Sequence, residues 1–446
     1  MLFHRVVIIG AGESGCKVAI KLAQSEIDVL LVENNEIGGS YIYSHDIPKK
    51  AFKEIDVVEK SKLSNLSKII NRTVGLKLKK LKTKIAKYPN LKIIKGSAKF
   101  LTKQLLEITQ PDNRMVVSFE ECVISTGKQK MEMPSINGLN SITFMHQHNS
   151  YYGDDIPSSV AVIGCNPESL EFADIYGDLG VKVKIFDSNE TNKILVHHDA
   201  TTVNYLIQSL LAKNVEFFFG ADINLIQKKI SDNLNSSAVQ LFDQEQNEYL
   251  TDSLYTNVHE CFEDTVGLLG LGIKFNEGGI LVTDGYQTAL RNIYAFGSNI
   301  QRFKLVNQNI ILANLADKII HNVKADSKSR SVVLFNSNNS NQTNFLKEVN
   351  FGVHQVNTIN PIATLGLSYR QATGQFGSLV KFEIYLHLEY NGFVKVIYND
   401  QSGQLFGIAL AGQTCKKIND IAFLSLKNNQ NHKEFKTTLT ILGYQI

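Results

Sequence analysis

The sequence lacks any pair of cysteines close enough to form a CxxC motif or a metal-binding cluster. Five cysteines are scattered over 446 residues, at Cys16, Cys122, Cys165, Cys261 and Cys415. This spacing excludes a disulfide framework and a zinc-finger-type site, and it is typical of buried thiols in a reducing compartment. We therefore predict free cysteines and no metal site.

An excess of charge of one sign is also missing. Lysine and arginine number 46 and aspartate and glutamate 43, so the net charge is only +3. A chain so nearly balanced is not expected to have nucleic acid or an anionic membrane as its main partner. There is no long uninterrupted apolar segment, and the first strand begins within about five residues, too early for a leader. We predict a cytoplasmic protein that is not bound to a membrane.

The single dense basic run of the sequence covers residues 77–87. It places Leu78, Leu81 and Ile85 at helical spacing beneath six lysines. This arrangement favours the solvated face of an amphipathic helix over an anion-binding patch.

What the sequence does contain is a dinucleotide-binding pattern near its beginning. A compact apolar run, Arg5–Ile9, leads into the glycine loop Gly10-Ala11-Gly12-Glu13-Ser14-Gly15, and a helical segment and a second apolar run follow. Glu33 closes that second run about 20 residues after the loop, where a Rossmann fold places a carboxylate for ribose hydroxyls. Strand, glycine loop, helix, strand and acid together predict a βαβ unit whose helix N-terminus binds a pyrophosphate.

The same pattern returns at residues 159–187. An apolar run leads into Gly164-Cys165-Asn166-Pro167-Glu168-Ser169, then a helix, then a strand that ends at Asp187. Asn166 and Ser169 replace the second and third glycines, and Pro167 removes a backbone donor, so side chains stand where a pyrophosphate needs the backbone. We expect a second Rossmann-like unit that either binds NAD(P)H, with Asp187 suiting NAD better than NADP, or keeps only the fold.

Two segments together carry a family resemblance. The glycine loop and the stretch Gly38-Gly39-Ser40-Tyr41-Ile42-Tyr43-Ser44-His45-Asp46-Ile47-Pro48-Lys49-Lys50 resemble the opening of the FAD-dependent pyridine nucleotide-disulfide oxidoreductases, relatives of dihydrolipoamide dehydrogenase and glutathione reductase. Similar landmarks continue in the same order to about residue 427. The resemblance implies an α/β protein with two Rossmann-like dinucleotide-binding domains, of FAD and NAD(P) type, and a C-terminal α+β dimerisation domain.

The resemblance also implies domain boundaries. Residues 288–298 are similar to the family's return to the FAD domain, so the first domain is discontinuous. The serine-, asparagine- and glutamine-rich stretch after it indicates an exposed connection. The predicted division is an FAD-binding domain at 1–148 and 284–325, an NAD(P)-binding-like domain at 149–283, a polar linker at 326–347 and a dimerisation domain at 348–446.

Individual cofactor contacts follow from the same resemblance. It implies FAD contacts beside the glycine loop and Glu33, at the turn after Gly38, at the ends of strands and at one lysine near the flavin ring. The predicted FAD residues are Gly10, Gly12, Glu13, Ser14, Gly15, Glu33, Gly39, Ser40, Lys50, Ala98, Thr126, Gly127, Gly297 and Ser298. The predicted NAD(P) residues are Gly164, Glu171 and Asp187. Ser298 stands where the family has an aspartate, a loss of about 1.5–3 kcal/mol of binding.

The residues that carry the family's disulfide chemistry are replaced. Its two cysteines fall on Tyr41 and Asp46, which form neither a disulfide nor a thiolate. The family's C-terminal His-Pro base is absent as well, and His432, isolated beside Glu434 in a polar stretch, is expected to be exposed. Tyr41 and Asp46 are either products of drift or a ring and a carboxylate beside the flavin. No catalytic residue is assigned.

The sequence leaves two functions open. The first is an FAD-dependent oxidoreductase that passes electrons from NAD(P)H, through FAD, to a non-disulfide acceptor such as a quinone, a dye, a metal ion or oxygen. The second is a catalytically inactive dimeric binding or scaffold protein of the same fold. The joint retention of the glycine loop, Glu33 and Lys50 favours the first. A homodimer is implied by the resemblance.

Overall fold

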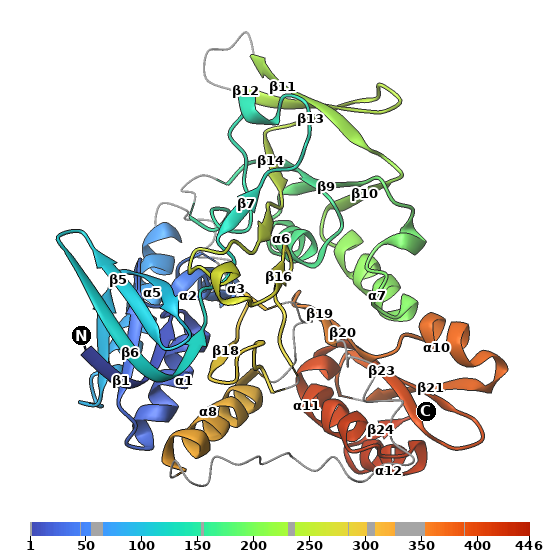
Figure 1. The fold of residues 1–446 in the computed structure, drawn as a ribbon. Coiled ribbons are helices and arrows are strands. Elements are labelled where there is room, and N and C mark those ends of the chain that lie inside the picture. The colour runs from blue at the N-terminus through green and yellow to red at the C-terminus, as the bar shows by residue number, and fades with distance from the viewer. Residues whose placement is uncertain are drawn as a thin grey trace.

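The computed structural model of the chain describes residues 2–44, 46–54, 66–152, 156–230, 237–283, 285–300, 308–325, 353–387 and 389–446. Figure 1 shows three groups of elements, with the N-terminal strands and helices in blue and cyan and the C-terminal group in orange and red. The predicted polar linker, 326–347, lies outside the described residues. Within the described ranges, no helix has the length and apolarity to cross a membrane.

The first sheet has seven strands centred on a buried parallel core. In spatial order, six of them are β3 (Leu91–Lys95), β2 (Val29–Glu33), β1 (Leu2–Ile9), β6 (Asn113–Ile124), β5 (Leu105–Gln110) and β4 (Ser97–Thr102). The first four run parallel and the last two extend the sheet as an antiparallel meander. The seventh strand, β18 (Ile293–Ala295), pairs in parallel with β6, so the chain returns to this sheet late in the sequence.

Helices pack around this sheet. α1 (Glu13–Gln24), which follows β1 directly, contacts α8 (Gln308–Lys324) and α5 (Leu66–Ile85). Two shorter helices, α2 (Gly39–Tyr43) and α3 (Asp46–Glu54), lie between β2 and α5 in the chain, and α3 packs on α5.

The lysine run lies on α5. Ile85 is buried, Leu78 and Leu81 are half-buried, and the six lysines of residues 77–87 are exposed. The predicted amphipathic helix is therefore confirmed. Its apolar stripe packs against the cores of the first and second groups.

The second group repeats the βαβ arrangement. Its parallel sheet consists of β10 (Val215–Phe219), β9 (Lys182–Asp187), β8 (Ser159–Ile163) and β14 (Ser253–Thr256). α6 (Pro167–Asp178) connects β8 to β9, and α7 (Ala200–Leu211) precedes β10. An antiparallel sheet of β11 (Ile223–Ile230), β12 (Ser237–Asp243) and β13 (Glu248–Thr251) follows. A ribbon of β7 (Lys130–Glu132) and β15 (His259–Cys261) connects the second group to the first.

The C-terminal group is a six-stranded antiparallel sheet with helices. The strands, in spatial order, are β19 (Val353–Val356), β20 (Ile362–Gly366), β23 (Leu405–Gly412), β22 (Gly392–Asn399), β21 (Val380–His387) and β24 (Tyr444–Gln445). The helices are α10 (Tyr369–Phe376), α11 (Gln413–Lys427) and α12 (His432–Ile441). Two parallel-sheet units and one α+β unit confirm the predicted fold class, whereas the domain boundaries stay a prediction.

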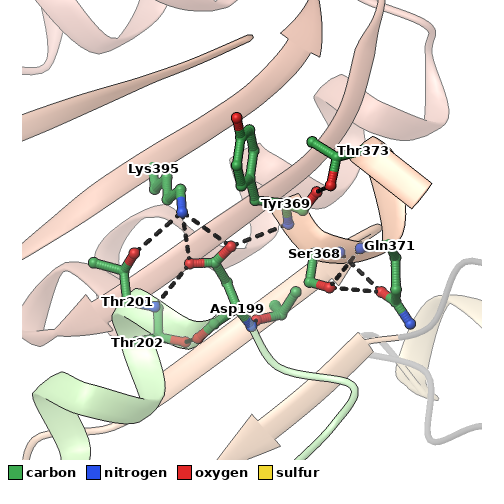
Figure 2. A network of polar contacts seen from close by, with 9 residues as sticks. Asp199, Thr201, Thr202, Ser368, Tyr369, Gln371, Thr373 and Lys395 are labelled. Carbon is green, nitrogen blue, oxygen red and sulfur yellow. Dashed lines mark hydrogen bonds and ion pairs between the residues drawn. The ribbon is translucent and has the colours of Figure 1, made fainter. Parts of the chain in front are cut away.

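A buried ion pair joins the second group to the C-terminal sheet. Asp199, the N-cap of α7, accepts two hydrogen bonds from the Lys395 ammonium on β22, at 2.9 and 3.1 Å, and others from the backbone N–H groups of Thr201 and Tyr369 (Figure 2). The side chains of Asp199 and Lys395 are only 1% and 5% exposed. The Lys395 ammonium also lies 4.5 Å from the centroid of the Phe382 ring. Both buried charges are thus compensated across this contact.

Three histidines meet beside the ion pair, where α7 begins near β19. The rings of His197 and His354 stack at 4.7 Å, and His198 lies edge-on to His354 at 5.9 Å. Burial, followed by repulsion from His354 and His197, lowers the pKa of His198 from 6.5 to about 3. Burial and His197 lower the pKa of His354 to about 4. His198 and His354 are therefore neutral at pH 7.

We expect this cluster to make the folded chain less stable as the pH falls below about 6.5. Between pH 6.5 and 3 the unfolded chain protonates His198 and the folded chain does not, so acid favours the unfolded state. The loss from His198 alone amounts to about 2 kcal/mol between pH 7.5 and pH 5. Urea unfolding at pH 7.5 and at pH 5 measures this change in the free energy of unfolding. His198→Phe should remove this increment and the exposed-residue control His321→Phe should keep it, whereas equal losses in all three proteins would contradict the prediction.

Candidate functional site

A cavity of 770 Å³ opens at the carboxyl ends of the parallel strands of the first sheet. Ligands of open α/β sheets bind at this edge. All the predicted FAD residues except Gly15 and Lys50 line it, namely Gly10, Gly12, Glu13, Ser14, Glu33, Gly39, Ser40, Ala98, Thr126, Gly127, Gly297 and Ser298. Residues separated by almost 300 positions in the chain are thus gathered around one space.

Gly10 and Gly15 serve the packing of the turn between β1 and α1. Gly10 has a φ of +103°, and a Cβ there would lie 2.2 Å from the carbonyl oxygen of Ser125. A Cβ on Gly15 would lie 2.0 Å from the carbonyl oxygen of Gly10. Side chains at either position would force β1, α1 and β6 apart. Gly10 also lines the cavity, whereas Gly15 is buried beneath the turn.

Gly12 faces the cavity instead. It is the N-cap of α1, with a φ of −64°, and a Cβ there would meet no atom within 4 Å. The first turn of a helix carries unpaired N–H groups and the positive end of the helix dipole, so an anion is favoured in this space. The turn therefore fits a pyrophosphate, and a side chain at Gly12 would take its place.

Glu33 stands at the end of β2 with its carboxylate against the glycine loop. One carboxylate oxygen accepts a hydrogen bond from the Ala11 N–H at 2.6 Å and the other from the Asn35 N–H at 2.9 Å. An ionised carboxylate has about four acceptor positions, so acceptor capacity remains for the hydroxyls of a ribose. The placement suits the role that the resemblance implies.

The loop that precedes α2 forms the opposite wall. The Gly38 N–H donates to the Ala11 carbonyl at 2.8 Å, and a Cβ on Gly39 would lie 3.0 Å from the Gly12 Cα. The two glycine-rich loops thus pack backbone to backbone. α2 then brings Tyr41 to the cavity wall.

The buried lysine of this region is Lys49, whereas Lys50, which the resemblance places near the flavin, is exposed. The Lys50 ammonium lies 5.9 Å from the centroid of the Tyr41 ring. Lys49, 8% exposed, forms an ion pair with Glu171 of α6, and Glu171 also accepts a hydrogen bond from the Asn357 N–H. Glu171, predicted to contact NAD(P), therefore ties α3 to α6 and to the loop before β20.

The described residues that line the cavity include no thiol in place of the missing pair. All five cysteines are buried and free, as predicted, and none is among the described residues that line the cavity. Burial, and then Glu33, raises the pKa of Cys16 to about 12. Burial likewise raises the pKa of the other four thiols. Tyr41 lines the cavity, and Asp46 is the first residue of α3.

At the second glycine turn, side chains satisfy the donors that a dinucleotide would need. The Asn166 side chain caps α6 by accepting the Ser169 N–H at 2.9 Å, and it also accepts from the Asn257 side chain. The Cys165 N–H donates to an Asp187 carboxylate oxygen at 2.6 Å. Gly164 keeps a left-handed φ of +89° and places Asp187 beside the turn. A pyrophosphate would have to displace the Asn166 cap.

His432 is buried, contrary to the expectation from its polar surroundings. It is 8% exposed, its ring stacks on Tyr398 at 3.7 Å, and Nε2 lies 3.3 Å from a Glu383 carboxylate oxygen. Asn431 and Glu434 form a capping box that starts α12 at His432 and turns the ring toward the sheet. The histidine therefore belongs to the core of the C-terminal group.

Three polar residues of the cavity wall carry no sequence signal. Lys128 and Gln129 follow Gly127, and Glu260 lies on β15. They come together because β15 pairs with β7 directly after this segment, and the Gln129 N–H donates to the Cys261 carbonyl. A long-range strand pairing of this kind leaves no local motif.

Comparisons with known proteins agree with this geometry. Residues 4–311 match the family model described as pyridine nucleotide-disulphide oxidoreductase. The dihydrolipoyl dehydrogenase of Staphylococcus aureus is 23% identical over 465 residues, which cover 97% of this chain and 92% of the relative. The dihydrolipoyl dehydrogenase of Buchnera aphidicola subsp. Acyrthosiphon pisum is 23% identical over 339 residues, 72% of this chain and 70% of the relative.

Solved structures show the same fold. The Cu(II) complex of the HOCl-induced flavoprotein disulfide reductase RclA from Escherichia coli superposes with a TM-score of 0.76 at 20% identity, over 96% of this chain and 94% of that one. A second structure of RclA from Escherichia coli gives a TM-score of 0.74 at 19% identity, over 95% of this chain and 93% of that one. The family model covers more than half of the sequence and includes the whole glycine loop and the cavity. The chain therefore belongs to the pyridine nucleotide-disulphide oxidoreductase family, whose members depend on FAD and NAD(P).

Proposed function

We propose that the chain is an FAD-binding flavoprotein that passes electrons from NAD(P)H to a non-disulfide acceptor. The observation that carries the proposal is the cavity at the end of the first sheet, which retains an open Gly12, the N-terminus of α1 and Glu33 on one wall. Gly12 and α1 would hold the pyrophosphate, and Glu33 the adenosine ribose. Thr126, Gly127, Gly297 and Ser298 would border the rest of the cofactor.

The absence of thiols from the described cavity wall indicates how the electron acceptor would reach the flavin. Bound FAD would supply hydride chemistry and storage for two electrons. Tyr41 and Asp46 cannot relay electrons as thiols do, and burial keeps the five cysteines protonated at neutral pH. An acceptor would therefore have to enter the cavity itself, beside Tyr41.

Colour and bleaching test the proposal. We expect the purified chain to retain FAD, to lose its flavin absorbance under anaerobic addition of NADH, and to do so faster than with NADPH because Asp187 favours an unphosphorylated ribose. Lipoamide, a disulfide, should not be reduced. A colourless chain that takes up no FAD when titrated, or rapid lipoamide reduction, would refute the proposal.

One observation favours a scaffold without turnover as the second candidate. The Asn166 cap occupies the donor that a dinucleotide pyrophosphate needs at α6. If the yellow chain is not bleached by either nucleotide, the flavin has only a structural role and the second candidate replaces the first. In either case we propose a cytoplasmic homodimer joined through the C-terminal group, where Phe382 and Leu386 on β21 are 42% and 55% exposed.

A further inference from the structure

Three polar side chains from distant segments form a chain that ends at the wall of the cavity. The Ser44 hydroxyl, directly after α2, lies 3.0 Å from Nδ1 of His148, and Nε2 of His148 lies 2.7 Å from a carboxylate oxygen of Glu260. The His148 side chain is 11% exposed and that of Glu260 is 33% exposed. Glu260 lines the cavity and Ser44 is half-buried, so these three side chains connect the cavity with the protein surface.

The three groups can be ordered as donors and acceptors without conflict. A neutral imidazole donates from one ring nitrogen and accepts at the other. With the proton on Nε2, His148 faces the Glu260 carboxylate across the 2.7 Å contact and accepts the Ser44 hydroxyl at Nδ1. The imidazole takes a proton at Nδ1 from the Ser44 hydroxyl, which regains one from solvent, and releases its Nε2 proton to the Glu260 carboxylate. Histidine commonly serves as a proton shuttle of this kind.

A separate pair of hydrogen bonds fixes this arrangement. The buried Gln147 side chain donates to the Val258 carbonyl at 2.7 Å and accepts the Val258 N–H at 3.0 Å. Gln147 precedes His148, and Val258 lies two residues before Glu260. The turn and the strand are therefore held in register, as a positioned acid–base group requires.

We propose that Glu260 donates a proton to the acceptor reduced in the cavity, is resupplied through His148 and Ser44, and thereby selects a quinone as substrate. The inference rests on the proposed flavin function. A quinone becomes a hydroquinone by gaining two electrons and two protons. One hydrogen nucleus arrives with both electrons as hydride, and the second proton comes from the Glu260 carboxyl to the other quinone oxygen. A one-electron acceptor such as ferricyanide takes up no proton and does not need this residue.

Several neighbouring segments place charged and titratable groups around Ser44, His148 and Glu260. His146 packs edge-on to His148 at 5.8 Å, and burial, followed by repulsion from His148, lowers its pKa. Lys130 and Glu132 on β7 pair with each other at 2.6 Å. The cavity wall adds Glu13, Glu33, Glu36 and Lys128, and β15 adds His259. Any pH profile therefore has to be compared with that of a variant in which only Glu260 is changed.

The experiment compares Glu260→Gln, His148→Gln and Ser44→Ala with the parent, and uses exposed His259 on the same strand, as His259→Gln, for the control. FAD content and anaerobic bleaching are measured first, because they test the proposed function independently. Reoxidation by a water-soluble benzoquinone is then compared with reoxidation by ferricyanide. We expect Glu260→Gln to slow the quinone reaction by about 100-fold or more, the lower end of what general acid catalysis contributes, and to leave the ferricyanide reaction within about twofold.

Two readouts separate proton transfer from a structural role. The solvent deuterium isotope effect on the quinone reaction should be present in the parent and in His259→Gln, and should change in Glu260→Gln. In the chain without cofactor, the imidazole ¹⁵N signals of His148, identified by their loss in His148→Gln, should show a proton on Nε2 and should shift in Glu260→Gln. The second readout is independent of flavin turnover.

Several results would overturn the proposal. Equal slowing of quinone and ferricyanide reduction in Glu260→Gln would assign Glu260 to binding or packing. An unchanged quinone rate in both Glu260→Gln and His148→Gln would exclude the proton route. Labelling of Ser44 by a fluorophosphonate, lost in Ser44→Ala, would assign the three residues to ester hydrolysis instead. Parent protein that retains flavin but is not bleached would refute electron entry, and with it the proposed function on which the inference rests.

Discussion

Replacing Gly12 by valine is expected to abolish retention of FAD while the chain stays folded. Gly12 has an ordinary φ of −64°, and a Cβ there meets no protein atom within 4 Å, so neither the backbone nor a Cβ is strained in the unliganded chain. The added isopropyl group would stand where the pyrophosphate has to approach the α1 amides. Loss of two hydrogen bonds to a charged group, at about 1.5 kcal/mol each, weakens binding by about 3 kcal/mol or 100-fold.

The measurement is the FAD content of the purified variant, followed by an FAD titration of the stripped protein. Gly374→Val is a matched control, because Gly374 in α10 also has open space where a Cβ would stand. Far-ultraviolet circular dichroism and the unfolding midpoint should match the parent in both variants. A Gly12→Val protein as yellow as the parent would show that the pyrophosphate lies elsewhere, and the cavity would then lose its assigned role.

The glycine turn and strand end on one wall of the cavity were predictable because their requirements are local in sequence, whereas their role in binding FAD stays a prediction. The turn at Gly10, the cavity-facing Gly12 and the carboxylate of Glu33 each follow from a strand, loop, helix and strand read in order. The backbone requirements there are strict, so the residue type itself carries the information. The fold class was predictable because the same order of strand, turn, helix and strand recurs at the second glycine turn. Asn166 and Pro167 at that turn replace the residue types that favour a pyrophosphate.

The remaining features depended on side-chain direction and long-range pairing. Lys49 and Lys50 are adjacent, and only the rotation of α3 about its axis decides which one meets Glu171. The burial of His432 depends on the start of α12 and on Tyr398, a residue of another strand. Neither the rotation of a short helix nor a contact across a sheet leaves a signature in neighbouring residues. Sequence reasoning therefore missed the burial of Lys49 and wrongly assigned His432 to solvent.

Removal of the Asp199 carboxylate is expected to destabilise the chain by about 3–5 kcal/mol. In Asp199→Ala the Lys395 ammonium, 5% exposed and packed near the Phe382 and Tyr369 rings, would lose the carboxylate that compensates it. Figure 2 shows this carboxylate facing Lys395. The N-cap bond to the Thr201 N–H would be lost as well, which contributes about 1 kcal/mol of that total. Denaturant unfolding of the parent and the variant gives the difference directly.

Three further variants separate the contributions of the charge and of the helix cap to this loss of stability. Asp199→Asn keeps a capping oxygen and removes only the charge, so it should retain the part due to the cap. The double variant Asp199→Leu with Lys395→Met removes both charges and should recover most of the loss, because an apolar pair of similar volume avoids the desolvation of two ions. Glu248→Ala breaks the half-exposed pair with Lys229 and should cost less than about 1 kcal/mol. If Asp199→Ala costs no more than Glu248→Ala, the second and C-terminal groups are held together by apolar packing, and the ion pair only sets their register.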